Sequence, residues 1–190
     1  MASTAANVFA ATPNVTGAVR NAPLGTTPPT NATTALPAGW IDLGYIGEDG
    51  VTETITRDTE KKKAWGGATV KVLQTDFANT FQFAFMESIN ADVLKRVFGA
   101  SNVTNDGKGN ITVAKNKIQL PHESWAIDSK DGANLLRTYI PDGQITEIDD
   151  ITRVHTDTIM YTVTIEGFED EDGNNSYDFI YNDALADVTP

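Results

Sequence analysis

Two segments in which apolar and polar side chains alternate place the strongest constraint on how this chain can fold. Within residues 79–88 and 158–166, apolar side chains recur at alternate positions, and the side chains between them are mostly polar or small. Side chains two positions apart share one face of a β-strand, so the pattern predicts two strands that each bury one face. The apolar positions are Phe81, Phe83, Phe85, Ile159, Tyr161, Val163 and Ile165.

Asp-Gly pairs divide much of the remaining chain into short segments. Such pairs favour the tight turns of β-hairpins. Weaker strand candidates lie between them, so the sequence predicts a mainly β protein, a sandwich or barrel. The pairs begin at Asp49, Asp106, Asp131, Asp142 and Asp172, and the weaker strands are residues 70–74, 111–114, 117–120, 124–127, 135–140, 144–148 and 177–181.

Residues 90–99 follow a helical pattern instead. Asn90 can cap the amino-terminal end, Asp92 lies in the first turn, and Gly99 follows the last turn. Apolar residues recur at helical spacing, at Val93, Leu94, Val97 and Phe98. We expect one short α-helix that covers the core or closes one end of the sandwich.

The first 38 residues differ in composition from the rest. They contain one charged side chain, Arg20, and five of the eight prolines. Proline has no backbone N–H to donate to a β-sheet. The segment also has few apolar side chains, so burying them would offset little of the entropy that the chain loses when it is ordered. We therefore expect residues 1–38 to be an extended arm that becomes ordered on assembly, followed by a β domain in residues 39–190. Its apolar docking points would be Val8, Phe9, Val15, Val19 and Leu24.

Residues 47–67 are a long polar stretch, which is expected to be either a loop or a protruding hairpin. Alternation at Val51, Glu53 and Ile55 allows a strand at its start. Trp65, beside two glycines, can anchor this stretch either on its own core or on a neighbouring subunit. The candidate self-assembly residues of this stretch are Arg57, Lys61, Lys62, Lys63 and Trp65.

The net charge is strongly negative and unevenly placed. The chain has 14 Lys and Arg against 26 Asp and Glu, a net charge of −12. Up to residue 140 there are 13 basic and 13 acidic side chains, whereas beyond it Arg153 stands against 13 acidic ones. This balance argues against stable binding to nucleic acid or to an anionic membrane. The acidic region is either a solvated face or a surface whose negative electrostatic field repels polyanions and favours basic partners.

Catalytic and metal-binding patterns are sparse. The chain has no cysteine and only two histidines, His122 and His155, neither within a triad pattern. Residues 169–175 have carboxylates at alternate positions, as in a calcium loop, but lack the glycine and the final glutamate of that motif. An acidic hairpin turn is therefore the preferred interpretation, and no enzyme activity, metal or cofactor is expected. No apolar stretch approaches the ~20 residues that span a bilayer, and no export signal is readable.

The order of several short motifs resembles a known family. These are residues 42–46, 49–51, 55–57 and 64–67, followed by the Phe-alternating strand, Glu87-Ser88 and the helix from Asn90. Over residues 40–100, and more loosely to the end, the chain is similar to the major tail tube proteins of long, non-contractile-tailed bacteriophages, especially those that infect actinobacteria.

The resemblance implies a β-sandwich with one flanking helix, six copies of which join into a ring with a continuous inner barrel. Rings would stack into a hollow tube for DNA, with residues 47–67 contacting the next ring. It also implies assembly in the host cytoplasm, a place in the virion, and the tape measure, tail terminator and distal tail proteins as partners.

The lumen of such tubes is typically negative, which keeps DNA phosphates from adhering. The resemblance therefore suggests that part of the acidic carboxyl-terminal region faces the lumen. The candidate lumen-facing residues are Asp142, Glu147, Asp149, Asp150, Glu166, Glu169, Asp170, Glu171 and Asp172.

Other functions remain open at this point. A monomeric extracellular β-sandwich could bind a glycan or small ligand on Trp40, Trp65 or Trp125. Another tail or baseplate component, or the tube protein of a related secretion apparatus, would share the same fold.

Overall fold

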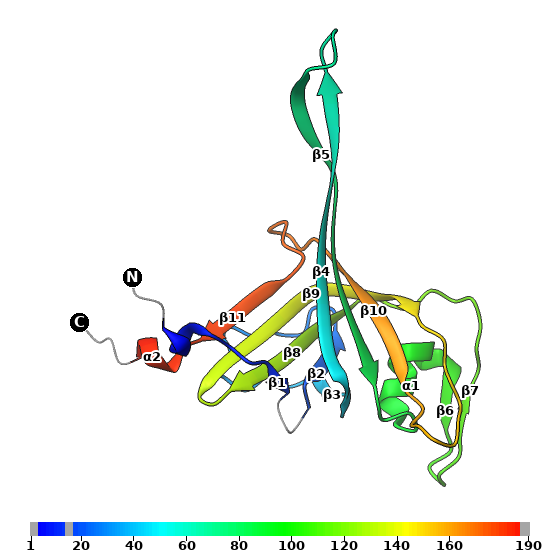
Figure 1. Cartoon of the computed structure of the whole chain (residues 1–190). Helices are drawn as coiled ribbons and strands as arrows, with labels where there is room; N and C mark the ends of the chain where they lie inside the picture. The colour runs from blue at the N-terminus through cyan, green and yellow to red at the C-terminus, as the bar shows by residue number, and fades with distance from the viewer. Residues whose placement is uncertain (1–3, 14–16, 187–190) are drawn as a thin grey trace.

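The computed structural model describes residues 4–13 and 17–186 and is mainly β (Figure 1). None of the described helices is long and apolar enough to cross a bilayer. The strands are β1 Thr12–Pro13, β2 Val19–Pro23, β3 Ile41–Asp42, β4 Ile46–Lys63, β5 Thr69–Phe85, β6 Val103–Asn105, β7 Ile111–Val113, β8 Glu123–Asp131, β9 Asn134–Ile148, β10 Tyr161–Phe168 and β11 Tyr177–Tyr181. The helices are α1 Ala91–Phe98 and α2 Asp183–Ala186, with single 3₁₀ turns at Ala5–Asn7 and Ala100–Asn102.

Nine strands form one antiparallel sheet in the order β3-β2-β8-β9-β10-β5-β4, with β1 added to β8 and β11 added to β9. β3 and β4 lie at opposite ends of this order, yet only residues 43–45 separate them in the chain. Four Cα steps span at most about 14 Å, so the sheet must curl until its two edges approach each other. Buried side chains from both halves, such as Val19 and Phe81, consequently share one core.

The two alternating segments are half-buried strands, as predicted. Phe81, Phe83 and Phe85 of β5 and Tyr161, Val163 and Ile165 of β10 are all buried. The register places Phe83 beside Val163 and Phe81 beside Ile165. Ile159 precedes β10 and is half-buried. β5 begins at Thr69, so the strand expected at residues 70–74 and the one expected at residues 79–88 form a single strand that pairs with β4.

Helix α1 matches its prediction and covers one side of the core. The Asn90 side chain accepts a hydrogen bond from the backbone N–H of Asp92 at 2.9 Å. Val93, Leu94 and Val97 are buried, and the Phe98 ring meets Tyr161 edge-on at 5.4 Å. The short hairpin β6–β7 lies beside this helix (Figure 1). A second helix, α2, was not expected from the sequence.

The Asp-Gly pairs do not all form turns between strands. Those at Asp106, Asp131 and Asp172 do so, whereas Asp49-Gly50 lies within β4 at a shift of register. Asp142-Gly143 lies inside β9, so residues 135–140 and 144–148 form one strand rather than two. A Cβ atom at Gly143 would lie 2.8 Å from Trp125 Cδ1, so this glycine makes room for a core indole. Residues 117–120, expected to be a strand, are not one.

The amino-terminal segment belongs in part to the body, which corrects the expectation of an arm over residues 1–38. β2 pairs with β8 from Val19 opposite Ile127 to Pro23 opposite Glu123. Val19 is fully buried, so its side chain cannot dock on another chain.

Arg137 supplies the physical reason. Its Nη1 donates to the carbonyl oxygens of Asn31 at 3.0 Å and Thr34 at 2.7 Å, while its Nε donates to Asp128 at 2.6 Å. A buried guanidinium therefore anchors a segment that has little apolar surface of its own. Asp128 also accepts from Arg20 at 2.7 Å, which holds β2. Composition alone cannot reveal such a partner more than 100 residues away.

Candidate assembly surfaces

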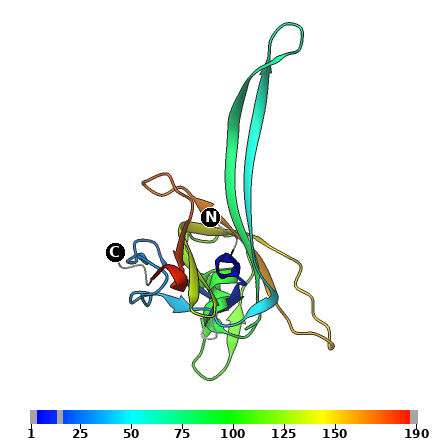
Figure 2. The same cartoon turned by 60° about the vertical axis from the view of Figure 1, so that its left-hand side comes forward.

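β4 and β5 form one long hairpin, and its far end protrudes from the body (Figures 1 and 2). Residues 46–55 and 79–85, the root half, lie in the sheet, because residues 79–85 of β5 also pair with β10. Residues 56–78, the distal half, pair only with each other among the described residues. Of the two expectations for residues 47–67, the chain forms the hairpin, and the hairpin extends beyond those limits.

The distal half is held by contacts across its two strands. The Arg57 guanidinium carbon lies 4.6 Å from the centre of the Phe77 ring, directly opposite, and Nη1 donates to Gln74 at 3.2 Å. Three aliphatic side chains here are exposed, Ile55 at the border and Val70 and Val72 further out. Isolated two-stranded hairpins are marginally stable in water. The distal half therefore has surface left to bury.

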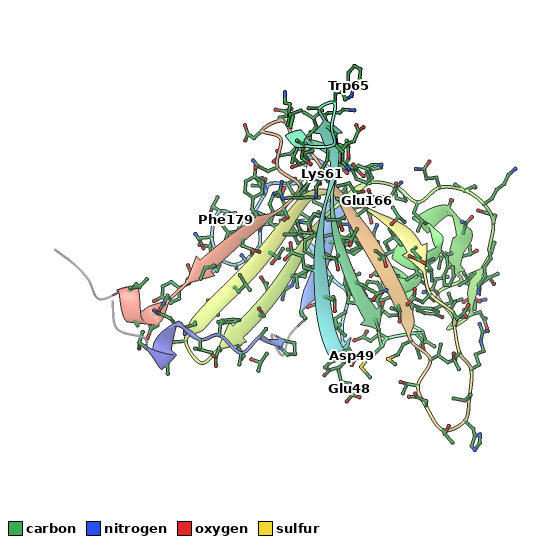
Figure 3. All side chains as sticks on the ribbon, turned by 45° about the horizontal axis from the view of Figure 1, so that its top comes forward. Glu48, Asp49, Lys61, Trp65, Glu166 and Phe179 are labelled. Atoms are coloured by element: carbon green, nitrogen blue, oxygen red, sulfur yellow. The ribbon has the colours of Figure 1, made fainter. Side chains whose placement is uncertain are left out.

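Trp65 lies at the outermost turn and is fully exposed, at 106% of its reference area (Figure 3). The turn is closed by backbone hydrogen bonds between residues 64 and 68 and between residues 67 and 64. Gly66 and Gly67 have φ values of 101° and 91°, a region that favours glycine. Of the two interpretations of Trp65, anchoring on its own core is wrong.

The hairpin tip, defined as residues 60–71, is basic although the chain is acidic. It carries Lys61, Lys62, Lys63 and Lys71 against Glu60, which gives 4 − 1 = +3. Lys62 lies directly opposite Lys71, and like charges in that position destabilise a hairpin. Glu60 offsets part of this repulsion, with its Oε1 2.6 Å from Lys62 Nζ. The tip thus combines an indole with unbalanced positive charge.

The other candidate assembly residues are scattered. Val8 and Leu24 are exposed, and Phe9 is half-buried. The backbone N–H of Ala10 donates to Asp131 at 3.0 Å and β1 pairs with β8, so this stretch lies along the sheet. Val15 lies outside the described residues.

A polar face lies on the side of β9, β10, β5 and β4 that points away from the phenylalanines. Register places Thr54, Thr80 and Glu166 in one row across these strands. A second row contains Thr52, Gln82, Thr164 and Glu147. These two rows, which we call the polar face, hold two carboxylates and no lysine or arginine.

Two of the nine candidate lumen-facing acids, Glu147 and Glu166, lie on the polar face. Asp142 is hydrogen-bonded to His122 Nδ1 at 2.6 Å, and Asp149 and Asp150 follow the end of β9. The remaining four, Glu169, Asp170, Glu171 and Asp172, lie in the turn that joins β10 to β11.

Asp170 organises that turn. Its Oδ1 accepts from the backbone N–H groups of Asp172 at 3.0 Å and Asn174 at 2.9 Å, and its Oδ2 accepts from the Tyr177 hydroxyl at 2.6 Å. The hydrogen bond from Tyr177, followed by those from the backbone, lowers the pKa of Asp170, and the same bond raises the pKa of Tyr177. Its oxygens serve the chain itself, and within the described residues no group of three His, Asp or Glu is arranged for a metal ion.

Only one of the three tryptophans is fully exposed. Trp125 is 1% exposed and donates to the Gly143 carbonyl at 3.2 Å. Trp40 is half-buried, packs edge-on against Tyr139 and donates to the Thr27 carbonyl at 3.2 Å. Burial therefore excludes Trp125 as a platform for a glycan, and Trp65 is the tryptophan with the most exposed surface.

A buried polar cluster that no pattern in the sequence indicated joins α1 to the sheet. Glu123 pairs with Arg96 of α1 and accepts from Asn21 Nδ2 at 2.8 Å. Burial raises the pKa of Glu123, and Arg96 and Asn21 counteract this in part. The cluster is structural, since it fixes the helix over β2 and β8.

Comparison with known proteins identifies one family. Residues 2–190 match the family model described as phage tail tube protein. No curated protein sequence matches the chain. Among solved structures, the chain is similar to one in the sheath–tube complex of an extracellular contractile injection system, PVC, in the extended state. The two are 8% identical, with a TM-score of 0.47 over 90% of this chain and 93% of that chain.

Proposed function

Because this chain belongs to the phage tail tube protein family and is a structural protein of the phage virion, we propose that six copies join into a ring. Rings stack into the hollow tube of the tail, and DNA leaves the virion through it. The chain is assembled in the host cytoplasm with the tape measure, tail terminator and distal tail proteins as its partners.

The main support for this proposal is the polar face, which forms the wall of the lumen. Its second row spans four strands and its first row three, and together they carry hydroxyl groups, an amide and the carboxylates of Glu147 and Glu166. Binding to DNA phosphates depends on lysine and arginine, which the face lacks. The two carboxylates repel phosphate, so DNA passes without adhering.

Ring closure follows from the open edges of the same four strands. Residues 51–55 of β4 pair with β5 alone, and residues 144–148 of β9 pair with β10 alone, among the described residues. Unpaired edges are templates for pairing with another chain. In the ring, β4 of one copy pairs with residues 144–148 of its neighbour, and the inner strands become one continuous barrel.

Electron microscopy of the concentrated full-length chain, or of purified tails, tests the assembly. Hollow tubes of uniform diameter with six-fold symmetry are the expected result. Tails with another ring symmetry would contradict the hexamer, and a chain that stays outside the tail tube would contradict the whole proposal.

Charge reversal tests the lumen separately. Phage that carry Glu147→Lys and Glu166→Lys are expected to assemble tails but to eject DNA slowly or incompletely. The comparison pair is Glu171→Lys with Asp172→Lys, two further candidate acids that lie in the turn beyond β10 and off the polar face, and this pair is expected to leave ejection normal. Normal ejection from assembled virions with the first pair would remove the polar face as lumen wall.

A further inference from the structure

The end of the molecule opposite the hairpin tip carries exposed apolar side chains in a rigid setting. Residues 45–50 and 84–90, which we call the acceptor end, expose Tyr45 at 67%, Met86 at 37% and Ile89 at 85%. Figure 3 places Glu48 and Asp49, in this end, at the opposite end of the β4–β5 ribbon from Trp65.

Hydrogen bonds hold the two segments of the acceptor end together. The Met86 N–H donates to the Tyr45 carbonyl at 3.0 Å, and the Tyr45 N–H donates to Glu87 Oε1 at 3.2 Å. Glu87 Oε2 accepts from Asn90 Nδ2 at 2.8 Å, at the start of α1. The exposed side chains are thus mounted on fixed backbone, and binding here costs little ordering entropy.

The acceptor end is also acidic. Its two segments contain Glu48, Asp49 and Glu87 and no lysine or arginine. Glu48 and Asp49 are exposed, whereas Glu87 is half-buried by its hydrogen bonds. Tryptophan and lysine stems pack well on tyrosine and aliphatic surface, while ammonium groups reach carboxylates at the rim.

We propose that the acceptor end receives the hairpin tip of a second copy of this chain, with Trp65 against Tyr45, Met86 and Ile89 and the lysines toward Glu48 and Asp49. The inference rests on the proposed stacking of rings and names the surfaces that make it. Tip and acceptor lie at opposite ends of one ribbon, so the contact is head-to-tail and repeats without closing on itself.

Charge complementarity favours a second copy as the occupant. The tip carries +3 in a chain of net charge −12, so the rest of the chain carries −15 and any copy attracts the tip. The acidic turn at residues 169–172 is the strongest competing target. However, Glu169 of that turn lines a hollow with Ile55 and Phe77, so the turn lies beside the middle of the hairpin and not at the opposite end.

Cross-linking tests the contact directly, because the chain has no cysteine and engineered cysteines are unique. Ala64 and Ile89 are exposed. In assembled tubes, Ala64→Cys with Ile89→Cys and a short bis-maleimide is expected to give a ladder of multimers on denaturing gels. Each single variant gives monomers, and the control pair Ala64→Cys with Glu171→Cys gives no ladder. Tubes that form normally without the ladder, or with a ladder only from the control pair, would overturn the contact and leave the tube function standing.

Charge exchange provides the second test. Glu48→Lys with Asp49→Lys is expected to abolish tubes while leaving a folded chain. Adding Lys61→Glu and Lys62→Glu to that variant restores them, whereas Glu171→Lys with Asp172→Lys leaves tubes unaffected. Normal tubes from the first variant would overturn the inference, and an unmodified chain that forms no tubes would overturn the proposed function and the inference together.

Discussion

The root half and the distal half of the β4–β5 hairpin use the same two strands for opposite purposes. In the root half, Phe81, Phe83 and Phe85 are buried, and β10 pairs with β5 on its other edge. In the distal half, the strands have no third partner among the described residues, and Val70 and Val72 are exposed. The same two strands are therefore stabilised by burial in the root half and leave apolar side chains exposed in the distal half.

The two halves differ in how much stabilisation each gains from burying apolar surface. Burial of apolar area contributes about 25 cal/mol per Å², which the root half gains within the chain. The distal half gains less of it within the chain, because Val70 and Val72 stay exposed. It is long, basic at its tip and ends in an exposed indole, which fits a segment selected for assembly and not for the fold of the monomer.

The largest expected effect comes from opening the core of the root half. Phe83→Ala should lower the free energy of unfolding by about 3–5 kcal/mol, because it removes a buried ring and leaves a cavity. Urea unfolding of the unassembled chain measures it. The matched control, Val70→Ala, removes an exposed side chain of the distal half and should change the value by no more than about 0.5 kcal/mol. Similar losses in both variants would end the distinction between the halves.

Removing most of the distal half is expected to change the stability of the monomer little and to abolish the assembly of tubes. Residues 58–76 are replaced by Asn-Gly, which favours a two-residue turn between Arg57 and Phe77. The free energy of unfolding should change by less than about 1 kcal/mol, since the distal half buries little of the body. Unfolding in urea and electron microscopy of the same sample report the two effects. A body that unfolds, or tubes that still form, would contradict the assignment.

The smallest expected effect is a pH dependence confined to the body. The folded chain holds a proton on Glu123 above 4.5, its ordinary pKa, so between that value and the raised one it binds more protons than the unfolded chain. The free energy of unfolding should therefore fall as pH rises through this interval. Glu123→Gln should remove that slope, whereas Glu53→Gln, at the exposed edge of the hairpin, should keep it. The measurement is the urea unfolding midpoint of each variant from pH 4 to pH 7, and a slope that persists in Glu123→Gln would contradict the assignment to Glu123.

Local patterns in the sequence predicted the parts of the fold that depend on neighbours along the chain. Alternation at Phe81, Phe83 and Phe85 and the cap at Asn90 are properties of one segment, and both were right. Asp142-Gly143 has the same dipeptide as the true turns but lies opposite Trp125 in space. Only the partner across the sheet distinguishes a turn glycine from one that makes room for an indole.

The candidate surfaces were predictable to a similar degree. Two glycines beside Trp65 signalled an unusual turn, but not whether the indole faced its own core. Glu147 and Glu166 fall in neighbouring rows of one face only because a bulge in β9 sets the register there. The buried pairing of Arg137 with Asp128 and the acceptor end join residues from separate segments, and no single-segment pattern contains them.

The pairing of β2 with β8 governs the order in which a newly made chain can fold. Val19 pairs with Ile127, more than 100 residues later in the chain, so this edge of β2 has no partner in the sheet until β8 has been made. The β4–β5 hairpin closes locally, and hairpins form in about 1–10 μs. During synthesis the hairpin can therefore form long before β2 pairs with β8, and the two parts of the sheet are joined only when β10, which is made later still, pairs with both β9 and β5.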